Sequence, residues 1–524
     1  MFLPRVPNGA RLKTKMTDRP DTNQSTIASV NPALTGGVFR SGSENPHETI
    51  AALIDGGDDS EAVEAENTSP RAWGFDVEEI NRSYALAIWG GKAVVVNEQP
   101  SGPVNDRVRV MSFESMNPWF ANRYTEIVGS DGKVRPVTWA KAWHSHRDRR
   151  QYDGVEFFPN PDGAAGTPSY LNFWRGFDVK PSPAGSYHVF RDHLLTNVCG
   201  GDENLFKYVF GWMAHIVQKP RERLGTAIVL RGRRGTGKSK VGEVLGSLFS
   251  SHYFQVDEAR YITGQFNAHM ASCLLLQADE AVWAGDKAAE GRLKGLITSE
   301  TQMIESKGVD PIRLRNFLRV IMTSNEGWVV PAGMDERRFC VLDVGSGCAQ
   351  NHEYFGEMDD ELNAGGRERL LHDLLNFDLT QVDLWHAPQT RALLEQKIRS
   401  FDTIDDFWYN RLYDGSDWPS RVICTDFHSE YIKATTQMGV GRKRSNAEFG
   451  TRLAKLVPSM RKTRPAIETE PGVTRRVWCY EFPSLDDCRA AFDELLGQPV
   501  DWPALSPGEG GRALKSSSDD SVPV

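Results

Sequence analysis

The stretch Ala227-Ile-Val-Leu-Arg-Gly232-Arg-Arg-Gly-Thr-Gly-Lys238-Ser239 decides the fold predicted for this 524-residue chain. A short apolar run precedes the glycines, and residues 240–249 repeat apolar side chains at helical spacing. A strand, a glycine-rich loop ending in Lys-Ser and a helix form a pattern whose backbone N–H groups close around phosphates. The loop residues expected to contact a nucleotide are Gly232, Gly235, Thr236, Gly237, Lys238 and Ser239. Because the serine of such a loop ligates Mg²⁺, the predicted cofactors are ATP and Mg²⁺.

A second apolar run, Cys273-Leu-Leu-Leu-Gln-Ala-Asp279-Glu280, ends in two acids. We expect Asp279 to hold the metal through its water shell, while the hydroxyl of Ser239 ligates it. Glu280 is then positioned to polarise the water that attacks a phosphate. An acidic pair after a strand is common by itself. Its position after the glycine-rich loop favours a role in metal binding and catalysis.

A third run, Phe317-Leu-Arg-Val-Ile-Met-Thr-Ser-Asn325, ends in an amide. Parallel strand order would place Asn325 between the glycine-rich loop and the acidic pair, where it could sense a phosphate and orient water. The alternative is a turn-forming asparagine. Arg337 and Arg338 follow, and a guanidinium from a neighbouring subunit can stabilise charge during phosphoryl transfer. The alternative is a surface ion-pair cluster with Asp335 and Glu336, and the sequence does not decide which arginine faces the nucleotide.

The rest of the chain suggests an α/β protein with a parallel sheet at its centre. Residues 84–89 and 93–96, separated by Gly90-Gly91, predict a β-hairpin, and residues 204–217 and 366–400 have helical spacing. Helices near 404–413 and 425–433, followed by a strand at 475–482, suggest a winged helix. The predicted organisation is a disordered tail (1–72), a small α/β module (73–200), a helical collar with the ATPase core (201–365), a helical linker with a winged-helix module (366–502) and a second tail (503–524).

Composition narrows the class of protein. The net charge is −9, so binding to nucleic acid would have to rest on local basic surface. The seven scattered cysteines predict free thiols rather than a disulfide framework or a zinc ribbon. No apolar run is long enough for a membrane span, and we expect a cytoplasmic protein with no membrane partner.

One segment is strongly basic. Residues 433–476 hold eleven Lys and Arg against three Glu, and clustered cations gain affinity for phosphates by releasing counterions. Arg442, Lys443 and Arg444 precede a predicted helix, and we expect them to dock DNA. A solvated charged surface is the alternative reading of the same pattern.

The succession of motifs resembles the superfamily 3 helicases, a branch of the AAA+ motors found in viruses and plasmids, and within them the phage and plasmid primase-helicases. Met303-Ile-Glu-Ser-Lys307-Gly308 looks like the hairpin whose lysine touches DNA in the ring channel, and Lys294 is a second candidate. The resemblance implies a homo-hexameric ring, Mg-ATP hydrolysis and 3′-to-5′ movement on a single DNA strand at a replication fork. A phage- or plasmid-encoded chain would then work in the cytoplasm of a bacterial host.

The chain departs from these relatives in one respect. Many carry a primase domain ahead of the motor, which needs a carboxylate cluster on a well-formed sheet, and residues 73–200 show no such cluster. We therefore expect a separate primase or polymerase partner. Two other functions stay open: an AAA+ ATPase that remodels or loads replication proteins without unwinding, and a non-catalytic origin-binding scaffold. The sequence leaves the preference for DNA or RNA undecided.

Overall fold

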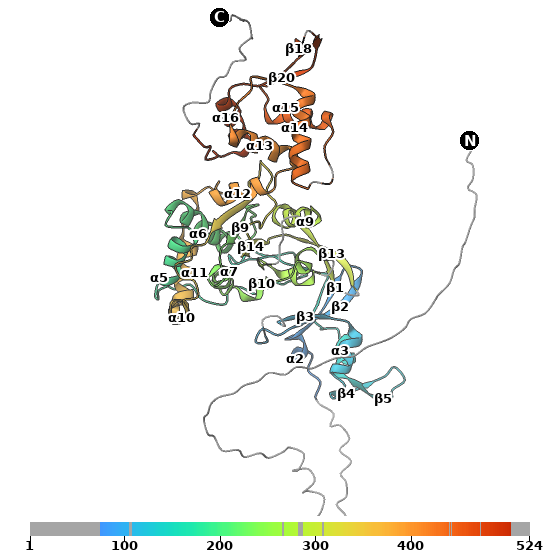
Figure 1. The fold of residues 1–524 in the computed structure, drawn as a ribbon. Coiled ribbons are helices and arrows are strands. Elements are labelled where there is room, and N and C mark those ends of the chain that lie inside the picture. The colour runs from blue at the N-terminus through green and yellow to red at the C-terminus, as the bar shows by residue number, and fades with distance from the viewer. Residues whose placement is uncertain are drawn as a thin grey trace, which may run out of the picture. The chain divides into compact units, whose positions relative to one another are not determined.

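The computed structural model describes residues 74–103, 107–264, 267–280, 287–306, 309–439, 441, 443–471 and 473–504. These residues form a mixed α/β structure with a parallel sheet, as the sequence predicts (Figure 1).

Five parallel strands make the central sheet, in the order β10-β11-β14-β9-β15. The strands are β9 (Ala227–Arg231), β10 (Tyr253–Val256), β11 (Leu275–Asp279), β14 (Arg319–Ser324) and β15 (Phe339–Asp343). Every residue of β9 and β14 is buried, which is the pattern expected of strands covered on both faces. Strands β9 and β10 follow each other in the sequence, but β11 and β14 lie between them in the sheet.

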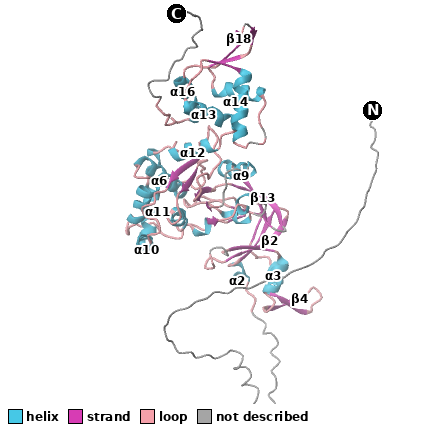
Figure 2. Cartoon of the chain, in the orientation of Figure 1, coloured by secondary structure: helices cyan, strands magenta, loops and turns pink. Residues whose placement is uncertain are grey.

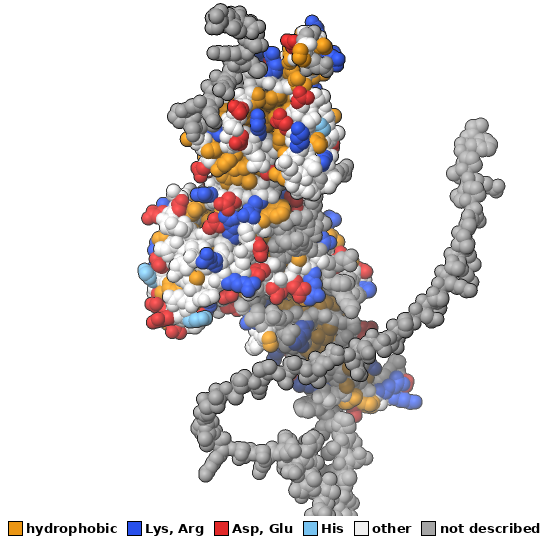
Figure 3. Space-filling view, in the orientation of Figure 1, with side chains coloured by type: hydrophobic (Ala, Val, Ile, Leu, Met, Phe, Trp, Pro, Cys, Tyr) orange, Lys and Arg blue, Asp and Glu red, His pale blue; other side chains and the backbone are white. Residues whose placement is uncertain are grey.

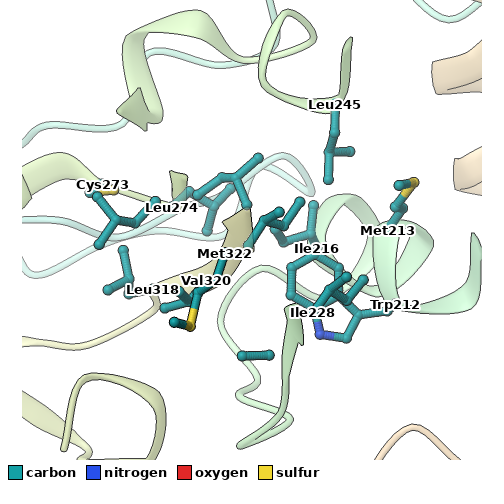
Figure 4. Close-up of a cluster of buried hydrophobic side chains, with 14 of the residues drawn as sticks. Trp212, Met213, Ile216, Ile228, Leu245, Cys273, Leu274, Leu318, Val320 and Met322 are labelled. Carbon is teal, nitrogen blue, oxygen red and sulfur yellow. The ribbon is translucent and has the colours of Figure 1, made fainter. Parts of the chain in front are cut away.

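Helices complete the core around this sheet. Helix α6 (Glu203–Gln218) is capped by Asp202, whose side chain accepts hydrogen bonds from the backbone N–H groups of Asn204 and Leu205. Its Trp212 and Ile216 pack with Ile228 of β9 and Leu245 of helix α7 (Lys238–Gly246) in one hydrophobic cluster (Figure 4).

The N-terminal sheet has the order β3-β2-β1-β6. It consists of β1 (Tyr84–Trp89), β2 (Lys92–Glu98), β3 (Val108–Met111) and β6 (Gln151–Tyr152), so the predicted hairpin is confirmed. Because side chains alternate along a strand, Trp89 and Val94 join the main core. Tyr84 and Val95, on the other face, pack on helices α3 (Phe113–Trp119) and α4 (Trp139–His144).

Two antiparallel hairpins and a short parallel pair extend the described structure. The first hairpin joins β4 (Tyr124–Val128) to β5 (Val134–Thr138), and the pair joins β7 (Gly154–Glu156) to β8 (Tyr170–Asn172). The second hairpin, β12 (Thr301–Ser306) with β13 (Val309–Arg315), follows helix α9 (Lys287–Thr298). Its position corresponds to the DNA-contacting hairpin suggested by sequence, but Lys307 and Gly308 lie outside the described residues.

Residues 366–400 are not one helical segment, which corrects the prediction. After helix α10 (His352–Glu361), helices α11 (Arg367–Asn376) and α12 (Arg391–Arg399) are separated by an irregular stretch. Pro388 lies in that stretch. Proline has no N–H to donate to a helical hydrogen bond, and its ring clashes with the preceding turn of a helix.

The C-terminal part has its own hydrophobic core. Figure 2 shows its helices beside a small group of strands. The helices are α13 (Thr403–Asp414), α14 (Cys424–Gln437), α15 (Asn446–Leu456) and α16 (Leu485–Leu496). The strands are β16 (Arg421–Ile423), β17 (Arg461–Thr463), β18 (Ala466–Glu470), β19 (Val473–Arg476) and β20 (Cys479–Glu481).

The strand predicted at 475–482 is divided into β19 and β20. Val477 donates its N–H to the carbonyl of Pro465, and the proline has no N–H to return. The ladder is therefore interrupted at this pair, although the chain continues in the same direction.

The seven cysteines are free, as predicted, and all of them are buried. Within the described ranges, no helix combines the length and the apolar character that crossing a membrane requires.

Two glycines in helices provide a matched test of the packing. A Cβ at Gly246 would overlap the ring of Tyr253, whereas a Cβ at Gly291 of α9 would meet nothing. We expect Gly246→Ala to lower the free energy of unfolding by about 1–3 kcal/mol through overpacking. Gly291→Ala should raise it by up to about 1 kcal/mol, because alanine is the better helix former. Chemical denaturation measures both, and equal effects would contradict the close approach of α7 to β10.

Candidate functional site

Polar side chains converge at the carboxyl ends of three adjacent parallel strands. The loop 232–237 follows β9, Asp279 ends β11, and Asn325 follows β14, which lies between the other two. The registers place Asp279 opposite Thr323, and Ser324 opposite Arg231. The crevice beyond the carboxyl ends of parallel strands is where open α/β sheets bind ligands.

The loop after β9 needs glycine at specific positions. Gly237 has φ +80°, and a Cβ there would lie 2.6 Å from the ring of His193. Gly235 has φ +74°, and its carbonyl accepts a hydrogen bond of 2.9 Å from the N–H of Gln350. Left-handed backbone and close contacts both exclude larger residues, so the loop keeps its shape only with glycine.

Lys238 is the first residue of α7, and its side chain turns back into the loop. Its Nζ donates to the carbonyls of Gly232 (2.9 Å) and Arg233 (2.7 Å) and to Oδ1 of Asn325 (3.0 Å). The residue is 7% exposed, and burial lowers the pKa of its ammonium, while Asp279 and Glu280 oppose that shift. All three contacts are neutral oxygens, so the positive charge is poorly compensated and suits an anionic ligand.

Ser239 and Asp279 form a pair beside this lysine. The Ser239 hydroxyl donates to Oδ2 of Asp279 at 2.9 Å, and Gln255 Nε2 donates to the same oxygen at 3.1 Å. The hydroxyl of Thr323 donates to Oδ1. Asp279 is thereby fixed by side chains from β10 and β14 as well as from α7.

Glu280 adopts an unusual backbone conformation. Its φ is +53°, a left-handed value that is uncommon for a residue with a side chain. Its N–H donates to the carbonyl of Thr323 at 2.9 Å, and its carboxylate accepts a hydrogen bond from Nδ2 of Asn325. Asn325 therefore bridges Lys238 and Glu280, and such strained residues concentrate at functional sites.

Arg337 and Arg338 lie at the amino ends of the strands, on the side of the sheet away from this site. Arg338 precedes β15, and its carbonyl accepts a hydrogen bond from the N–H of Ala227, the first residue of β9. Its guanidinium pairs at 3.2 Å with the carboxylate of Glu336, which is 3% exposed. Arg337 is exposed, and in the described part of the chain no ion pair holds its guanidinium.

Of the predicted DNA-binding residues, the structure describes Lys294, Lys443 and Arg444, and these do not lie on one element. Lys294 lies on α9 rather than on a hairpin, and its Nζ contacts Glu290 (2.6 Å) and Glu336 (3.7 Å). Lys443 donates to the hydroxyl of Thr436, and Arg444 pairs with Glu448 at 3.6 Å. Arg442, like Lys307, lies outside the described residues.

Sequence reasoning missed the residues that support the site from behind. His193 is buried, its Nε2 lies 3.3 Å from the carbonyl of Gly237, and burial lowers its pKa. The Cys348 thiol lies 3.8 Å from His193 Nδ1 and 3.6 Å from the carbonyl of Thr236. Both residues are distant in sequence and carry no local signal. The polar run Thr323-Ser-Asn325 at the end of an apolar strand was a usable signal for Thr323.

The described residues contain no group of three His, Cys, Asp or Glu side chains placed to hold a metal. Ser239 and Asp279 offer one hydroxyl and one carboxylate, which are oxygen ligands. Such a partial set fits Mg²⁺, which is usually held by one or two carboxylates, several waters and phosphate oxygens.

The comparisons with known proteins agree with this fold. Residues 230–338 match a family of unknown function, DUF5906. Over 286 residues, 52% of the chain, the sequence is 27% identical to a DNA primase-polymerase of Nitratiruptor phage NrS-1. The match covers 39% of that protein, so the chain spans about two fifths of the length of this curated relative.

Solved structures of the apo C-terminal region of NrS-1 are also similar. One covers 83% of this chain and 93% of that region, with a TM-score of 0.50 and 17% identity. Another covers 78% and 98%, with a TM-score of 0.53 and 16% identity. The chain therefore shares the fold of that region.

The support of Asp279 by Thr323 can be measured directly. Thr323→Val keeps the shape of the side chain and removes the hydroxyl that donates to the carboxylate. Because hydrogen bonds to charged groups contribute about 1.5–3 kcal/mol, we expect a loss of about 2 kcal/mol in the free energy of unfolding. Thr323→Ser keeps the donor and is the matched control. An unchanged stability in Thr323→Val would contradict the contact.

Proposed function

We propose that this chain is a Mg-ATP-dependent motor of the superfamily 3 helicase type that moves on single-stranded DNA during phage DNA replication. The observation that carries the proposal is the bridge of Asn325 between Lys238 and Glu280, beside the pair Ser239–Asp279. A buried cation, an oriented carboxylate and a metal-type oxygen pair occur together at the end of one parallel sheet, as an AAA+ ATPase core requires.

The residues present fit ATP and Mg²⁺. Gly235, Thr236 and Gly237 would present backbone N–H groups to the phosphates, whereas the N–H of Gly232 donates to the carbonyl of Ser324. Lys238 would exchange its neutral contacts for phosphate oxygens. Ser239 and Asp279 would hold Mg²⁺, which supplies positive charge where the phosphates need it. The displaced loop carbonyls can be solvated by water.

Hydrolysis would use the two residues after the strands. Glu280 is the general base, since its carboxylate lies beside Asn325 and no cation pairs with it among the described residues. Asn325 is a positioning residue in this scheme, because its amide orients the carboxylate while its oxygen contacts Lys238. Glu280 combines a left-handed backbone with an exposed side chain.

Arg337 is the better candidate for a guanidinium that acts between subunits. Arg338 is committed to the buried Glu336, and Arg337 is exposed. Strand β9 has five residues, a length of about 16 Å, and it separates these arginines from the loop that follows its other end. An arginine cannot reach the nucleotide of its own chain over that distance, so it would serve a neighbouring subunit in a homo-hexameric ring.

The role in DNA replication rests on the relative. The similar phage protein is a DNA primase-polymerase, and the family match at residues 230–338 includes the site. The hairpin β12–β13, between whose strands Lys307 falls in the sequence, would contact the DNA strand. Primer synthesis would belong to a separate partner.

ATP hydrolysis with and without single-stranded DNA tests this function. We expect DNA to stimulate the wild type several-fold, Lys238→Ala to be inactive, and Lys307→Ala to keep basal turnover while losing the stimulation. Turnover without any response to nucleic acid would favour the remodelling ATPase. Nucleotide binding without turnover would favour the origin-binding scaffold.

Mixing two inactive variants tests the arginine assignment. Arg337→Ala retains Lys238, and Lys238→Ala retains Arg337, so a mixed ring contains complete sites only if the arginine acts between subunits. We expect activity to return when the two proteins are mixed, and an inactive mixture would contradict the assignment. Arg338→Ala is the structural comparison, because it leaves Glu336 with less compensation and should lower stability instead.

A further inference from the structure

Two neighbouring β-ladders in the C-terminal part run in one continuous register. Strands β17 and β20 pair Lys462 with Tyr480, and β18 and β19 pair Ala466 with Arg476. The sum of the paired residue numbers is the same in both ladders as far as the pair Glu468–Thr474, after which the second ladder is irregular. The hydrogen bond between Val477 and Pro465 continues this register between the two ladders. The same register places Arg464 opposite Trp478.

Alternation along the strands then assigns side chains to faces. One face carries Lys462, Arg464 and Arg476 together with Trp478, and we call these four residues the basic strip. All four are exposed, and Trp478 is 50% exposed. Figure 3 shows Lys and Arg side chains beside hydrophobic ones around this hairpin.

Two cations of the strip, Lys462 and Arg464, lie over the ring of Trp478. Lys462 Nζ lies 5.4 Å and the Arg464 guanidinium 5.6 Å from the centre of the Trp478 ring. Cations at such distances are attracted to the ring, so the two side chains are held in place without a salt bridge.

Little negative charge opposes the strip. Glu481 lies on the other face, where it accepts a hydrogen bond of 2.7 Å from Arg421. Glu468 is at the far end of the strip, opposite Thr474. Within the described residues, no salt bridge neutralises Lys462, Arg464 or Arg476.

From this arrangement we infer that the basic strip binds the phosphodiester backbone of DNA. From Lys462 to Ala466 the strand extends about 13 Å, which matches about four nucleotides of one strand at 3.4 Å each. The cations contact phosphates, and the exposed part of Trp478 contacts sugar or base. This inference rests on the proposed function only in naming DNA as the partner, and it adds a contact outside the ATPase site.

The strip differs from the basic triplet 442–444 in its availability. Arg444 has a salt bridge and Lys443 a hydroxyl partner, whereas the strip presents its charges outward on a rigid ladder. Base-independent contacts of this kind fix the position of a protein on DNA and make binding sensitive to salt.

Equilibrium binding of the full chain to labelled DNA, without nucleotide, tests the inference. Anisotropy is measured on duplex and on single-stranded DNA between about 50 and 200 mM salt. For the double variant Lys462→Gln/Arg464→Gln, we expect the slope of log affinity against log salt to become shallower by about 1.8 on duplex. On single strands the expected change is about 1.4, since each phosphate contributes about 0.9 or 0.7. The form of DNA on which the slope changes by its expected amount is the form that the strip binds.

Arg461→Gln/Arg475→Gln is the matched control, because it removes the same charge from the opposite face of the ladder. The inference is overturned if both double variants change the slope equally, or if neither does. The second result would leave an acidic protein as the partner. Trp478→Ala should weaken binding several-fold, and Trp478→Phe, which keeps an aromatic face for the cations, should retain most of the affinity.

Basal ATP hydrolysis separates this inference from the proposed function. None of the substituted residues belongs to the ATPase site, so basal turnover should be unchanged in every strip variant. A chain that binds DNA through the strip but shows no ATP hydrolysis would contradict the motor and leave the strip intact. If the chain is instead a DNA-stimulated ATPase whose strip variants bind DNA unchanged, the motor is supported and the inference about the strip is contradicted.

Discussion

The site depends on one constraint, which is that β14 lies between β9 and β11 in the sheet. Parallel pairing brings the three carboxyl ends to the same edge, and the central position gives Asn325 a neighbour on each side. Its oxygen then meets Lys238 and its nitrogen meets Glu280. With this strand order a single amide contacts both the cation and the carboxylate.

A buried carboxylate has a comparable role at the other edge of the sheet. Glu336 accepts hydrogen bonds from the backbone N–H groups of Arg337 (3.0 Å) and Arg338 (2.8 Å), and it pairs with the Arg338 guanidinium. These contacts fix the backbone of the turn before β15. The exposed Arg337 therefore projects from a turn whose backbone is held by Glu336.

The sequence was most informative where local chemistry and strand order coincide. The glycine-rich loop, the acidic pair and the hairpin at 84–96 have signals within a few residues, and parallel order allowed the position of Asn325 to be anticipated. His193 and Cys348 could not be predicted, because their contacts with the loop depend on tertiary packing alone. The helical segment at 366–400 was overestimated, since apolar spacing outweighed the effect of Pro388.

The charge of a segment also does not predict what its individual cations do in the folded protein. The basic segment 433–476 looks uniform in sequence, but folding divides its cations into different classes. Arg452 forms a two-point salt bridge with Asp405, at 2.6 Å for each contact, and Asp405 is 6% exposed, so this cation contributes to packing. Lys462 and Arg464 instead lie over an exposed indole ring. A composition cannot make that distinction, because it depends on which carboxylates the fold brings within reach and which face of a strand remains in water.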